Sequence, residues 1–255
     1  MPGLAQWRQS RFNRSFEAGQ AIGTCRGVFD TLAQAAAAAP TTRPLGYDNN
    51  DAAAMYRDRL SRVYPSDYAM MLWLQNAFAD GVRSVFDLGG HIGLAYYAYQ
   101  RVVAFPQDVS WQVNDVPAVL ASGREEALVR DPSRRLTFNE NFEAAADADL
   151  LFTAGCLQYL EESLAQRIAA LPRRPRWVLV NLLPLHEQLS FWTVQSIGAA
   201  FCPYRIQQKA GFFSDMEKLG YRSLDTWENL DKSCWVAFRP EHTLDRYYGA
   251  AFRLE

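Results

Sequence analysis

The sequence predicts an α/β fold in which a mostly parallel, seven-stranded β-sheet is flanked by helices and ends in an antiparallel hairpin. Apolar runs typical of buried strands alternate with segments of helical length through residues 84–183. Residues 221–240 contain two strand-like runs separated by a short polar turn, which is typical of a hairpin at a sheet edge. Residues 1–80 carry helical patterns, so we expect a helical N-terminal region before the sheet.

Residues 1–80 are predicted to form a helical extension that serves as a lid. "FDTLAQAAAAAP" combines strong helix formers with a stopping proline, and "DAAAMYRDRL" resumes a helical pattern after turn residues. "YPSDYAMMLWLQNAFADG" offers Ser66 or Asp67 as an N-cap, apolar residues at helical spacing, and Gly81 as a terminator. This last helix leads directly into the first strand of the sheet.

Residues 81–255 are predicted to form the α/β domain. Strands are expected in "SVFDLGG", "SWQVNDV", "RLTFNENF", "ADLLFTAG" and "RWVLVNLLP", with helices in "LAYYAYQRVVAF", "AVLASGREEALVR" and "LEESLAQRIAAL". The stretch at about 184–204 is long, aromatic and weakly periodic, so we expect an inserted lid there. "GFFSDMEKLG" then predicts a helix, and "YRSLDTWEN" and "SCWVAFRP" predict the final hairpin.

The length and composition of the chain are those of a globular protein. With 255 residues, of which 49% are hydrophobic, the chain is long enough to bury a full core. The formal net charge is −2 and the isoelectric point is near 6.0. Because basic residues are not in excess, nucleic acid is not an expected partner.

Cysteines and histidines show no metal-binding pattern. Cys25, Cys156, Cys202 and Cys234 are widely scattered and form no C-x-x-C, and the histidines are equally dispersed. We therefore expect neither a metal site nor a disulfide framework. The N-terminus has no apolar core of signal-peptide length, and no later run approaches the roughly 18 apolar residues of a membrane span. These features predict a cytoplasmic protein without a membrane partner.

The stretch "VFDLGGHIG" joins a buried-strand pattern to a glycine loop. Gly89 and Gly90 follow the strand directly, and Gly93 comes three positions later. Such glycines indicate a turn where the backbone approaches a ligand closely. An open parallel sheet binds ligands beyond the carboxyl ends of its strands, where the first strand turns into its helix. The loop is therefore the first candidate for a binding site.

Two ligand-binding patterns each fit this loop in part. The dinucleotide pattern G-x-G-x-x-G needs a glycine where the chain has Leu88, and an acid followed by G-x-G-x-G needs one where it has His91. Asp87 distinguishes between these two patterns, because a carboxylate at the strand end hydrogen-bonds an amino group but repels a pyrophosphate. The acid favours a cofactor with an aminoacyl group.

The next strand supplies a second acid. Asp115 ends "SWQVND", where its carboxylate can accept hydrogen bonds from both hydroxyls of a ribose, and Val116 follows it. NAD enzymes share this feature, so it supports a nucleoside without selecting one. Asp115 alone is equally compatible with an N-cap for the following helix. Asp87 and Asp115 together, on consecutive strands, predict a cofactor site.

The order of elements is that of a Rossmann-like class I S-adenosylmethionine-dependent methyltransferase, whereas a dehydrogenase would continue with a second nucleotide-binding half. The blocks "VFDLGGHIGLAYYAY", "WQVNDVPAV", "LTFNENF", "DLLFTAGCLQYL", "WVLVNLLPL" and "FFSDMEKLGYRSLDTWEN" resemble, in this order, those of a provisional bacterial family of class I methyltransferases with a D-F-G-G-S-x-G loop. The N-terminal "GVFDTLAQA" and "GYDNND" also resemble that family. His91 replaces its usual small residue, and Asp115 its usual glutamate.

The resemblance implies S-adenosylmethionine as the cofactor. By position in the methyltransferase pattern, Asn141 would hydrogen-bond the adenine, Phe142 would pack on its ring, and Gly155 and Cys156 would line the methyl-donor end. Phe142 and Cys156 are equally compatible with ordinary core packing. The expected cofactor-binding residues are Asp87, Gly89, Gly90, His91, Gly93, Asp115, Val116, Asn141, Phe142, Gly155 and Cys156.

Three residues are candidates for catalysis. Methyl transfer needs alignment of donor and acceptor, and a base where the acceptor is a hydroxyl or ammonium group. His91 is the candidate base by position, with hydrogen bonding to the cofactor carboxylate as its rival role. Tyr159 and His186 follow the ends of two strands, where the acceptor would enter. Tyr159 is equally compatible with packing at a helix start, and His186 with a surface position near Glu187.

We therefore expect an enzyme that transfers a methyl group to a small molecule and releases S-adenosylhomocysteine. The resemblance implies a sugar or natural-product intermediate as acceptor; the residues select neither oxygen, nitrogen nor carbon, and they are compatible with a homo-oligomer. The alternative is a degenerate methyltransferase fold that serves as a binding or scaffold protein. The replacement of the usual small loop residue by His91 is compatible with this alternative. A thiol enzyme using Cys156 with His186 lacks a nucleophile signature, and the G-x-S-x-G of serine hydrolases does not occur.

Overall fold

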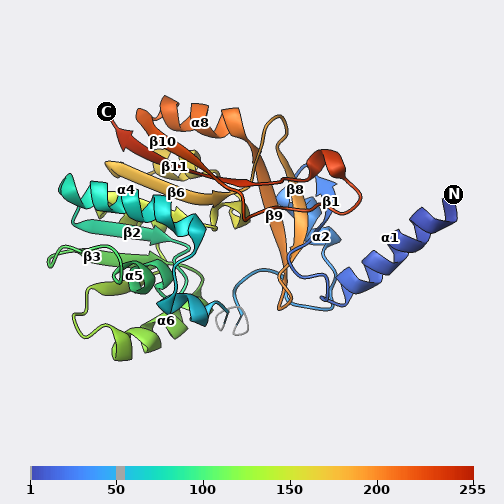
Figure 1. The fold of residues 1–255 in the computed structure, drawn as a ribbon, viewed down its shortest axis with the longest axis horizontal. Coiled ribbons are helices and arrows are strands. Elements are labelled where there is room, and N and C mark those ends of the chain that lie inside the picture. Colours follow the sequence, from blue (N-terminus) through green and yellow to red (C-terminus); the bar gives the residue numbers. More distant parts are fainter. Residues whose placement is uncertain (1, 50–54) are drawn as a thin grey trace.

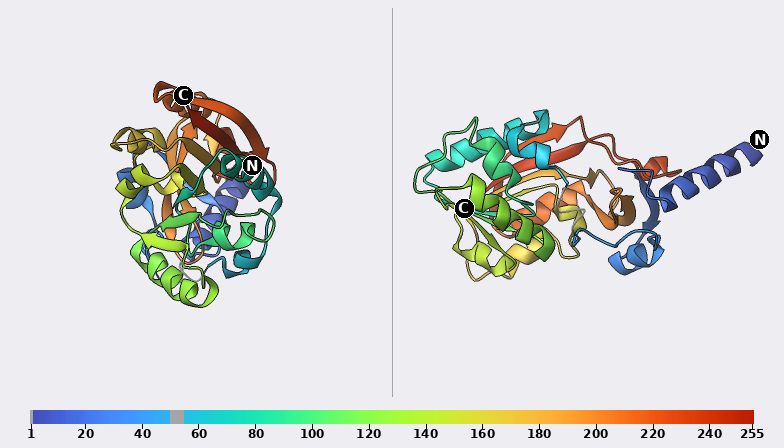
Figure 2. Two further views of the ribbon diagram at one scale, coloured as in Figure 1. Left: turned by 90° about the vertical axis from the view of Figure 1, so that its left-hand side faces the viewer. Right: turned by 90° about the horizontal axis from the view of Figure 1, so that it is seen from below.

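The fold is built on two β-sheets that lie side by side along the long axis of the molecule (Figure 1). This computed structural model describes residues 2–49 and 55–255. The larger sheet lies at one end, and the smaller sheet follows it. Helix α1 (Pro2–Glu17) extends away from the body beyond the smaller sheet, as the right-hand view of Figure 2 also shows.

The larger sheet has seven strands in the order β10-β11-β6-β5-β2-β3-β4. Their bounds are β2 (Ser84–Leu88), β3 (Ser110–Asn114), β4 (Leu136–Asn139), β5 (Leu150–Ala154), β6 (Trp177–Leu183), β10 (Tyr221–Asn229) and β11 (Tyr247–Leu254). β2 pairs in parallel with β3 and β5, whereas β11 runs antiparallel to β6 and β10. The predicted mostly parallel sheet with antiparallel C-terminal strands is confirmed.

The strand order reverses beside β2. The chain runs from β2 outward through β3 to β4, and then returns to β5 on the other side of β2. In open α/β sheets, ligands bind outside the carboxyl ends of the strands at such a reversal. The ends of β2, β3 and β5 are therefore the place to look for a site.

Helices pack on both faces of this sheet. On one face, α4 (Tyr68–Ala79), α5 (Leu94–Tyr99) and α6 (Pro117–Arg130) contribute to a core centred on Trp111 and Phe152. On the other face, α7 (Leu164–Ala169) and α8 (Lys209–Lys218) pack against β5, β6 and β11. The helical spacing in α4 is confirmed by its buried residues, which are Met70, Met71, Leu74, Ala77 and Phe78.

The smaller sheet contains four strands in the order β1-β8-β9-β7. Their bounds are β1 (Cys25–Phe29), β7 (Leu185–His186), β8 (Phe191–Ser196) and β9 (Phe201–Gln208). The stretch at 184–204 thus forms β7, β8 and the start of β9. β1 comes from the N-terminal region, and α2 (Leu32–Ala38) follows it, so the expectation of a wholly helical region at 1–80 is wrong. Antiparallel pairing with the apolar β8 stabilises the extended backbone of β1.

The second strand of the C-terminal hairpin is also not where the sequence pattern placed it. "SCWVAFRP" contains no strand; its backbone forms isolated bridges from Cys25 to Val236 and from Cys234 to Leu244. β11 takes the position in the sheet instead, between β10 and β6, and six of its eight residues are buried. Hydrogen bonding to a strand on each side therefore favours Tyr247–Leu254 over "SCWVAFRP", although the latter is rich in apolar residues.

Part of the helical pattern "DAAAMYRDRL" lies outside the described residues. Its end forms the 3₁₀ helix η1 (Arg57–Ser61), and η2 (Pro65–Asp67) follows shortly before α4. Asp67 takes the position at the start of α4, but its carboxylate accepts a hydrogen bond from the Tyr64 N–H at 2.8 Å. These two short helices run beside the larger sheet, where η1 contacts α5.

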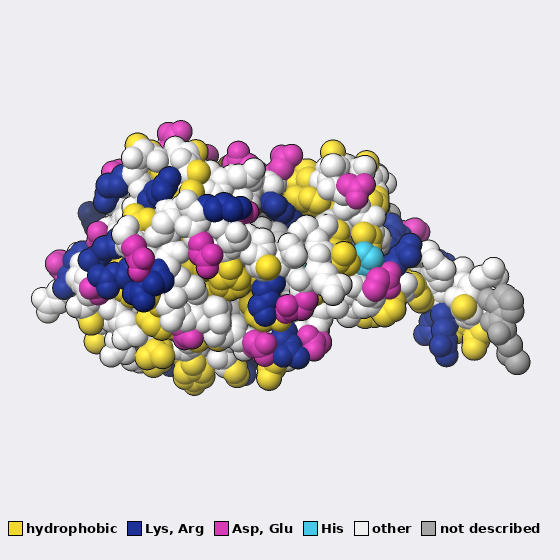
Figure 3. All heavy atoms as spheres, turned by 90° about the horizontal axis from the view of Figure 1, so that it is seen from above, with side chains coloured by type: hydrophobic (Ala, Val, Ile, Leu, Met, Phe, Trp, Pro, Cys, Tyr) yellow, Lys and Arg dark blue, Asp and Glu magenta, His cyan; other side chains and the backbone are white. Residues whose placement is uncertain are grey.

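Charged side chains of both signs are interspersed on the face that Figure 3 shows. In the ranges 2–49 and 55–255, no helix is both long and apolar enough to cross a membrane. Among these residues there is also no group of three or more His, Cys, Asp or Glu side chains placed to hold a metal ion.

Candidate functional site

The glycine loop after β2 is tightly packed. Gly89 and Gly93 have φ angles of +71° and +90°, which L-residues with side chains rarely adopt. A Cβ atom at Gly89 would lie 2.4 Å from the Cys156 Sγ atom, and one at Gly90 would lie 2.4 Å from the Asp87 carboxylate. The glycines therefore allow this loop to lie directly against the ends of β2 and β5.

His91 occupies the one position of the loop where the methyltransferase pattern expects another glycine. Its φ angle is +55°, in the left-handed region that histidine tolerates better than most residues. Its side chain is buried and packs edge-to-face against Tyr56, with 5.8 Å between the ring centroids. The substitution keeps the backbone conformation of the loop and adds an imidazole beside the N-terminal segment.

Asp115 fastens the loop to the end of β3. Its Oδ2 atom accepts a hydrogen bond from the His91 N–H at 2.9 Å, and its Oδ1 atom accepts one from the Val116 N–H at 2.8 Å. Burial raises the pKa of Asp115 above its ordinary value, and these two backbone donors act in the opposite direction. The second predicted acid thus lies against the loop, and each oxygen retains a further lone pair for a ligand.

Asp87 is a buried carboxylate beneath the loop. It is 1% exposed, and its Oδ2 atom accepts a hydrogen bond from the Trp111 Nε1–H at 3.0 Å. Burial raises the pKa of Asp87 to about 7; the Trp111 bond opposes this shift, and the nearby charge of Asp115 adds to it. A carboxyl group so perturbed beside an open pocket is typical of a functional site.

A pocket of about 470 Å³, open to solvent, lies over Asp87 and the loop. Its lining includes two arginines, Arg59 and Arg62, which no sequence motif indicated. The remaining lining residues come from β2, the loop, η2, α5, β5 and β6; they are Asp67, Asp87, Gly89, Gly90, Leu94, Ala95, Ala98, Tyr99, Phe152, Ala154 and Leu182.

The turn after β5 lies against the loop. Gly155 has a φ angle of +77°, and its N–H donates to the Asn181 carbonyl at 3.0 Å. The Gly155 carbonyl accepts a hydrogen bond from the Gln158 side chain at 2.9 Å. Burial raises the pKa of the Cys156 thiol far above its ordinary value, so this group is a neutral thiol at physiological pH. Gly155 and Cys156 thus lie at the end of β5, and Cys156 packs against the glycine loop.

Tyr159 points from this turn toward the smaller sheet. Its hydroxyl donates to the Gln195 Oε1 atom of β8 at 2.8 Å and lies 3.3 Å from the Tyr47 hydroxyl. Burial raises the pKa of Tyr159 well above its ordinary value. The phenol is therefore protonated at neutral pH and acts as a hydrogen-bond donor. It thus links the turn after β5 to β8 of the smaller sheet.

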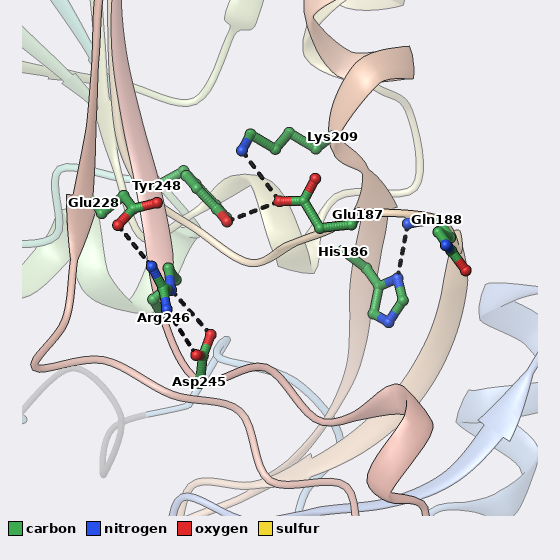
Figure 4. A network of polar contacts seen from close by, with 8 residues as sticks. All are labelled: His186, Glu187, Gln188, Lys209, Glu228, Asp245, Arg246 and Tyr248. Carbon is green, nitrogen blue, oxygen red and sulfur yellow. Dashed lines mark hydrogen bonds and ion pairs between the residues drawn. The ribbon is translucent and has the colours of Figure 1, made fainter.

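The imidazole ring of His186 is held by hydrogen bonds to backbone groups, two of which come from the turn that follows β7. Its Nδ1 atom accepts a hydrogen bond from the Gln188 N–H at 3.0 Å (Figure 4) and another from the Leu189 N–H at 2.9 Å. The proton must then lie on Nε2, which donates to the Glu241 carbonyl at 3.0 Å. These contacts fix a turn, and they do not join His186 to the glycine loop.

The surroundings of His186 are an exposed ion-pair network (Figure 4). Glu187 accepts hydrogen bonds from Lys209 at 3.1 Å and from the Tyr248 hydroxyl at 3.0 Å. Arg246 pairs with Glu228 and Asp245 nearby. Exposed pairs of this kind contribute little to stability, and the network belongs to the surface around β7.

Asn141 and Phe142 lie after β4. The Asn141 Oδ1 atom accepts a hydrogen bond from the Glu143 N–H at 2.9 Å and caps the 3₁₀ helix η3 (Phe142–Asp147). Phe142 packs edge-to-face on Phe86, and the Arg167 guanidinium lies over its ring at 4.9 Å. Asn141 is exposed and Phe142 is half-buried, so both have surface available beside the end of β4.

The fold is similar to solved structures that contain S-adenosylhomocysteine. The N-terminal domain of EvdMO1 with S-adenosylhomocysteine bound has a TM-score of 0.51 at 14% identity, over 77% of this chain and 83% of that one. The same domain in the presence of S-adenosylhomocysteine and D-fucose has a TM-score of 0.50 at 13% identity, over 76% and 85%. With the observed strand order, this shows the Rossmann-like class I methyltransferase fold.

A named methyltransferase is also similar in structure. The Burkholderia thailandensis 1,6-didemethyltoxoflavin-N1-methyltransferase, with 1,6-didemethyltoxoflavin and S-adenosylhomocysteine bound, has a TM-score of 0.48 at 15% identity, over 74% of this chain and 78% of that one. No protein-family model and no curated protein matches the sequence. The strand order and the similarity to the EvdMO1 domain confirm the predicted class I methyltransferase fold, while the provisional family stays a prediction.

Proposed function

We propose that this protein is an S-adenosylmethionine-dependent methyltransferase that acts on a small molecule. The observation that carries the proposal is the joining of Asp87, the glycine loop and Asp115 at the reversal point of a class I sheet, beside an open pocket. When bound, the cofactor supplies an electrophilic methyl group on a sulfonium. The protein has to hold it, orient the acceptor and remove a proton where the acceptor carries one.

The residues present fit such a cofactor. Gly89 and Gly90 line the pocket, and the absence of their side chains lets the loop pack directly on Cys156 and Asp87, so a ligand in the pocket can contact the loop. Asp87 is placed to accept a hydrogen bond from the α-ammonium group of the methionine portion. Asp115 has the remaining lone pairs for the ribose hydroxyls, with Val116 beside it.

Residues at the ends of the neighbouring strands β4 and β5 are assigned to the adenine and to the methyl-donor end of the cofactor. In our assignment, Asn141 and Phe142 meet the adenine, because both have exposed surface after β4. Gly155 and Cys156 line the donor end, because Cys156 packs on Gly89. The neutral Cys156 thiol does not compete with the acceptor as a nucleophile.

The acceptor side faces the smaller sheet. We assign segment 184–204 to this side, where Tyr159 meets β8 through Gln195. The Tyr159 hydroxyl donates its proton to Gln195, so in our assignment its oxygen orients the substrate by accepting a hydrogen bond, while His91 is the candidate base. The acceptor is a small molecule of the sugar or natural-product kind that the family resemblance implies. His186 is assigned a structural role, because both of its ring nitrogens hold a turn.

The proposal is tested by native mass spectrometry of the purified protein with candidate cofactors. One S-adenosylhomocysteine per chain supports it, and selective retention of NAD overturns it. A panel of small-molecule acceptors then tests turnover. His91→Ala should leave cofactor affinity nearly unchanged and slow turnover about 10²-fold, the usual scale for a lost general base. If affinity collapses instead and single-turnover chemistry survives, His91 is a cofactor ligand.

A further inference from the structure

The pocket over Asp87 is also lined by two positively charged residues, which come from η1 and from the residue that follows it. Arg59 lies in η1 and Arg62 immediately after it, and both line the pocket together with Asp87. Residues of both charge signs therefore line the same pocket. This juxtaposition does not follow from the glycine pattern, since η1 precedes β2 by more than twenty residues.

Both arginines pack on the ring of Tyr64. The Arg59 and Arg62 guanidinium carbons lie 5.0 and 4.9 Å from the centroid of the Tyr64 ring. Tyr64 is itself fixed, because its N–H donates to Asp67 at 2.8 Å and its hydroxyl donates to Asp58 at 3.0 Å. Ring contacts of this kind orient a guanidinium group and leave its N–H edge available to an anion.

Of these two arginines, Arg59 alone has a carboxylate partner among the residues that the structure describes. Its Nη2 atom lies 3.9 Å from the Asp67 Oδ1 atom, a long ion pair, and that oxygen also accepts a 3.0 Å hydrogen bond from the Tyr99 hydroxyl. Within the part of the chain that the structure describes, Arg62 forms no ion pair with a carboxylate. The pocket thus has positively charged residues that can bind an anion, in addition to the buried acid Asp87.

We propose that Arg59 and Arg62 bind the α-carboxylate of the methionine portion of the cofactor while Asp87 binds its α-ammonium group. A zwitterionic α-amino acid carries these two charges on one carbon, and the pocket presents a carboxylate and a guanidinium pair to match them. Arginine recognises carboxylates through paired N–H donors, which a lysine cannot reproduce. The inference rests on the proposed function and adds residues of the N-terminal region to the cofactor site.

The test compares two ligands that differ in the amino acid portion. S-adenosylhomocysteine contains it, whereas 5′-methylthioadenosine keeps the nucleoside and the thioether but lacks both charged groups. Dissociation constants are measured by isothermal titration calorimetry for the wild-type protein, Arg62→Ala, Arg62→Lys and Arg59→Ala. Arg57→Ala is the matched control, because Arg57 lies on the same 3₁₀ helix but pairs with Glu126 at 2.7 Å and does not line the pocket.

Arg62→Ala should weaken S-adenosylhomocysteine binding about 10- to 100-fold, the loss expected for charge-assisted hydrogen bonds, and leave 5′-methylthioadenosine binding unchanged. Arg62→Lys should recover only part of this loss, and Arg57→Ala should bind both ligands as the wild type does. Thermal melting of each unliganded variant shows whether it is folded.

Equal weakening of both ligands, or of neither, would overturn the assignment of the arginines and leave the proposed function standing. Arg59→Ala has an additional structural effect through Asp67, so the decisive comparison is made with Arg62. A wild-type protein that binds neither ligand would refute the proposed function, and this inference with it.

Discussion

The backbone N–H of His91 donates a 2.9 Å hydrogen bond to the Asp115 carboxylate, so the loop after β2 is fastened to the end of β3. Asp115 also accepts a bond from Val116 and therefore serves the fold before any ligand binds. This makes one residue both a support for the loop and, in our proposal, the acceptor of the ribose hydroxyls.

Asp115→Ala should consequently lower the melting temperature of the unliganded protein. Each hydrogen bond to a charged group contributes about 1.5–3 kcal/mol, and for a chain of this size each kcal/mol corresponds to roughly 2–4 °C. Most of the stabilisation by S-adenosylhomocysteine should also disappear, as measured by differential scanning fluorimetry. A variant that melts as the wild type does and keeps the full ligand-induced shift would show that Asp115 plays neither role.

The ionisation of Asp87 predicts opposite pH dependences for folding and for binding. Its pKa is about 7 in the folded protein against an ordinary value of 3.8, because burial disfavours the charged form. Its contribution to folding stability is therefore fully present below pH 3.8 and is lost as the pH rises toward and through 7. The unliganded wild type should lose more stability between about pH 5.5 and 7.5 than Asp87→Asn does.

Cofactor binding should change with pH in the other direction. The α-ammonium group of the ligand pairs with ionised Asp87, so S-adenosylhomocysteine affinity should rise about tenfold or more between roughly pH 5.5 and 7.5. Asp87→Asn should bind more weakly and show little of this rise; its side-chain oxygen can still accept the Trp111 bond. Equal pH profiles for the two proteins in calorimetry would remove Asp87 from the ammonium site.

Gly89 should be far less tolerant of substitution than another glycine with similar backbone geometry. Gly89 and Gly23 have φ angles of +71° and +77°, but a Cβ atom at Gly89 would lie 2.3 Å from the Cys156 Cβ atom, whereas one at Gly23 meets nothing within 4 Å. Gly23→Ala should cost about 1–2 kcal/mol for the left-handed conformation. Gly89→Ala should cost about 1–3 kcal/mol more for overpacking. Equal losses in urea denaturation would contradict the close contact between the loop and β5.

His91→Gly and His91→Ala should differ in stability, although both remove the contact with Tyr56. Alanine at a φ angle of +55° is strained by about 1–2 kcal/mol, while glycine costs about 0.4–1 kcal/mol through the unfolded chain. We therefore expect His91→Gly to be the more stable variant by roughly 0.5–1 kcal/mol in chemical denaturation. The reverse order would mean that the loop does not hold the left-handed conformation.

Much of the larger sheet could be predicted from the sequence, because its strands are buried on both faces and read as continuous apolar runs such as Trp177–Leu183. β1 could not be predicted, because Gly27, with a φ angle of +81°, interrupts a short strand that its pairing with β8 stabilises. β11 was missed because strand pairing on both sides, rather than local propensity, decides between Tyr247–Leu254 and the apolar run before it.

The positions of the candidate-site residues could be predicted where they follow directly from the ends of the strands. Asp87, the glycines and Asp115 lie at the ends of consecutive strands, so the sheet necessarily brings them to one edge. Arg59 and Arg62 gave no such signal, because their place in the pocket depends on the path of η1 and η2 and on Tyr64. His186 follows a strand end as well, but β7 belongs to the smaller sheet, and its ring is used in a turn.

The central claim is that the loop and its two acids hold S-adenosylmethionine. Isothermal titration calorimetry of the wild-type protein with S-adenosylhomocysteine and, separately, with NAD tests it without knowledge of the acceptor. We predict saturable binding of one S-adenosylhomocysteine per chain and no measurable binding of NAD. Binding of NAD with no response to S-adenosylhomocysteine would contradict the assignment of the site and of the proposed function.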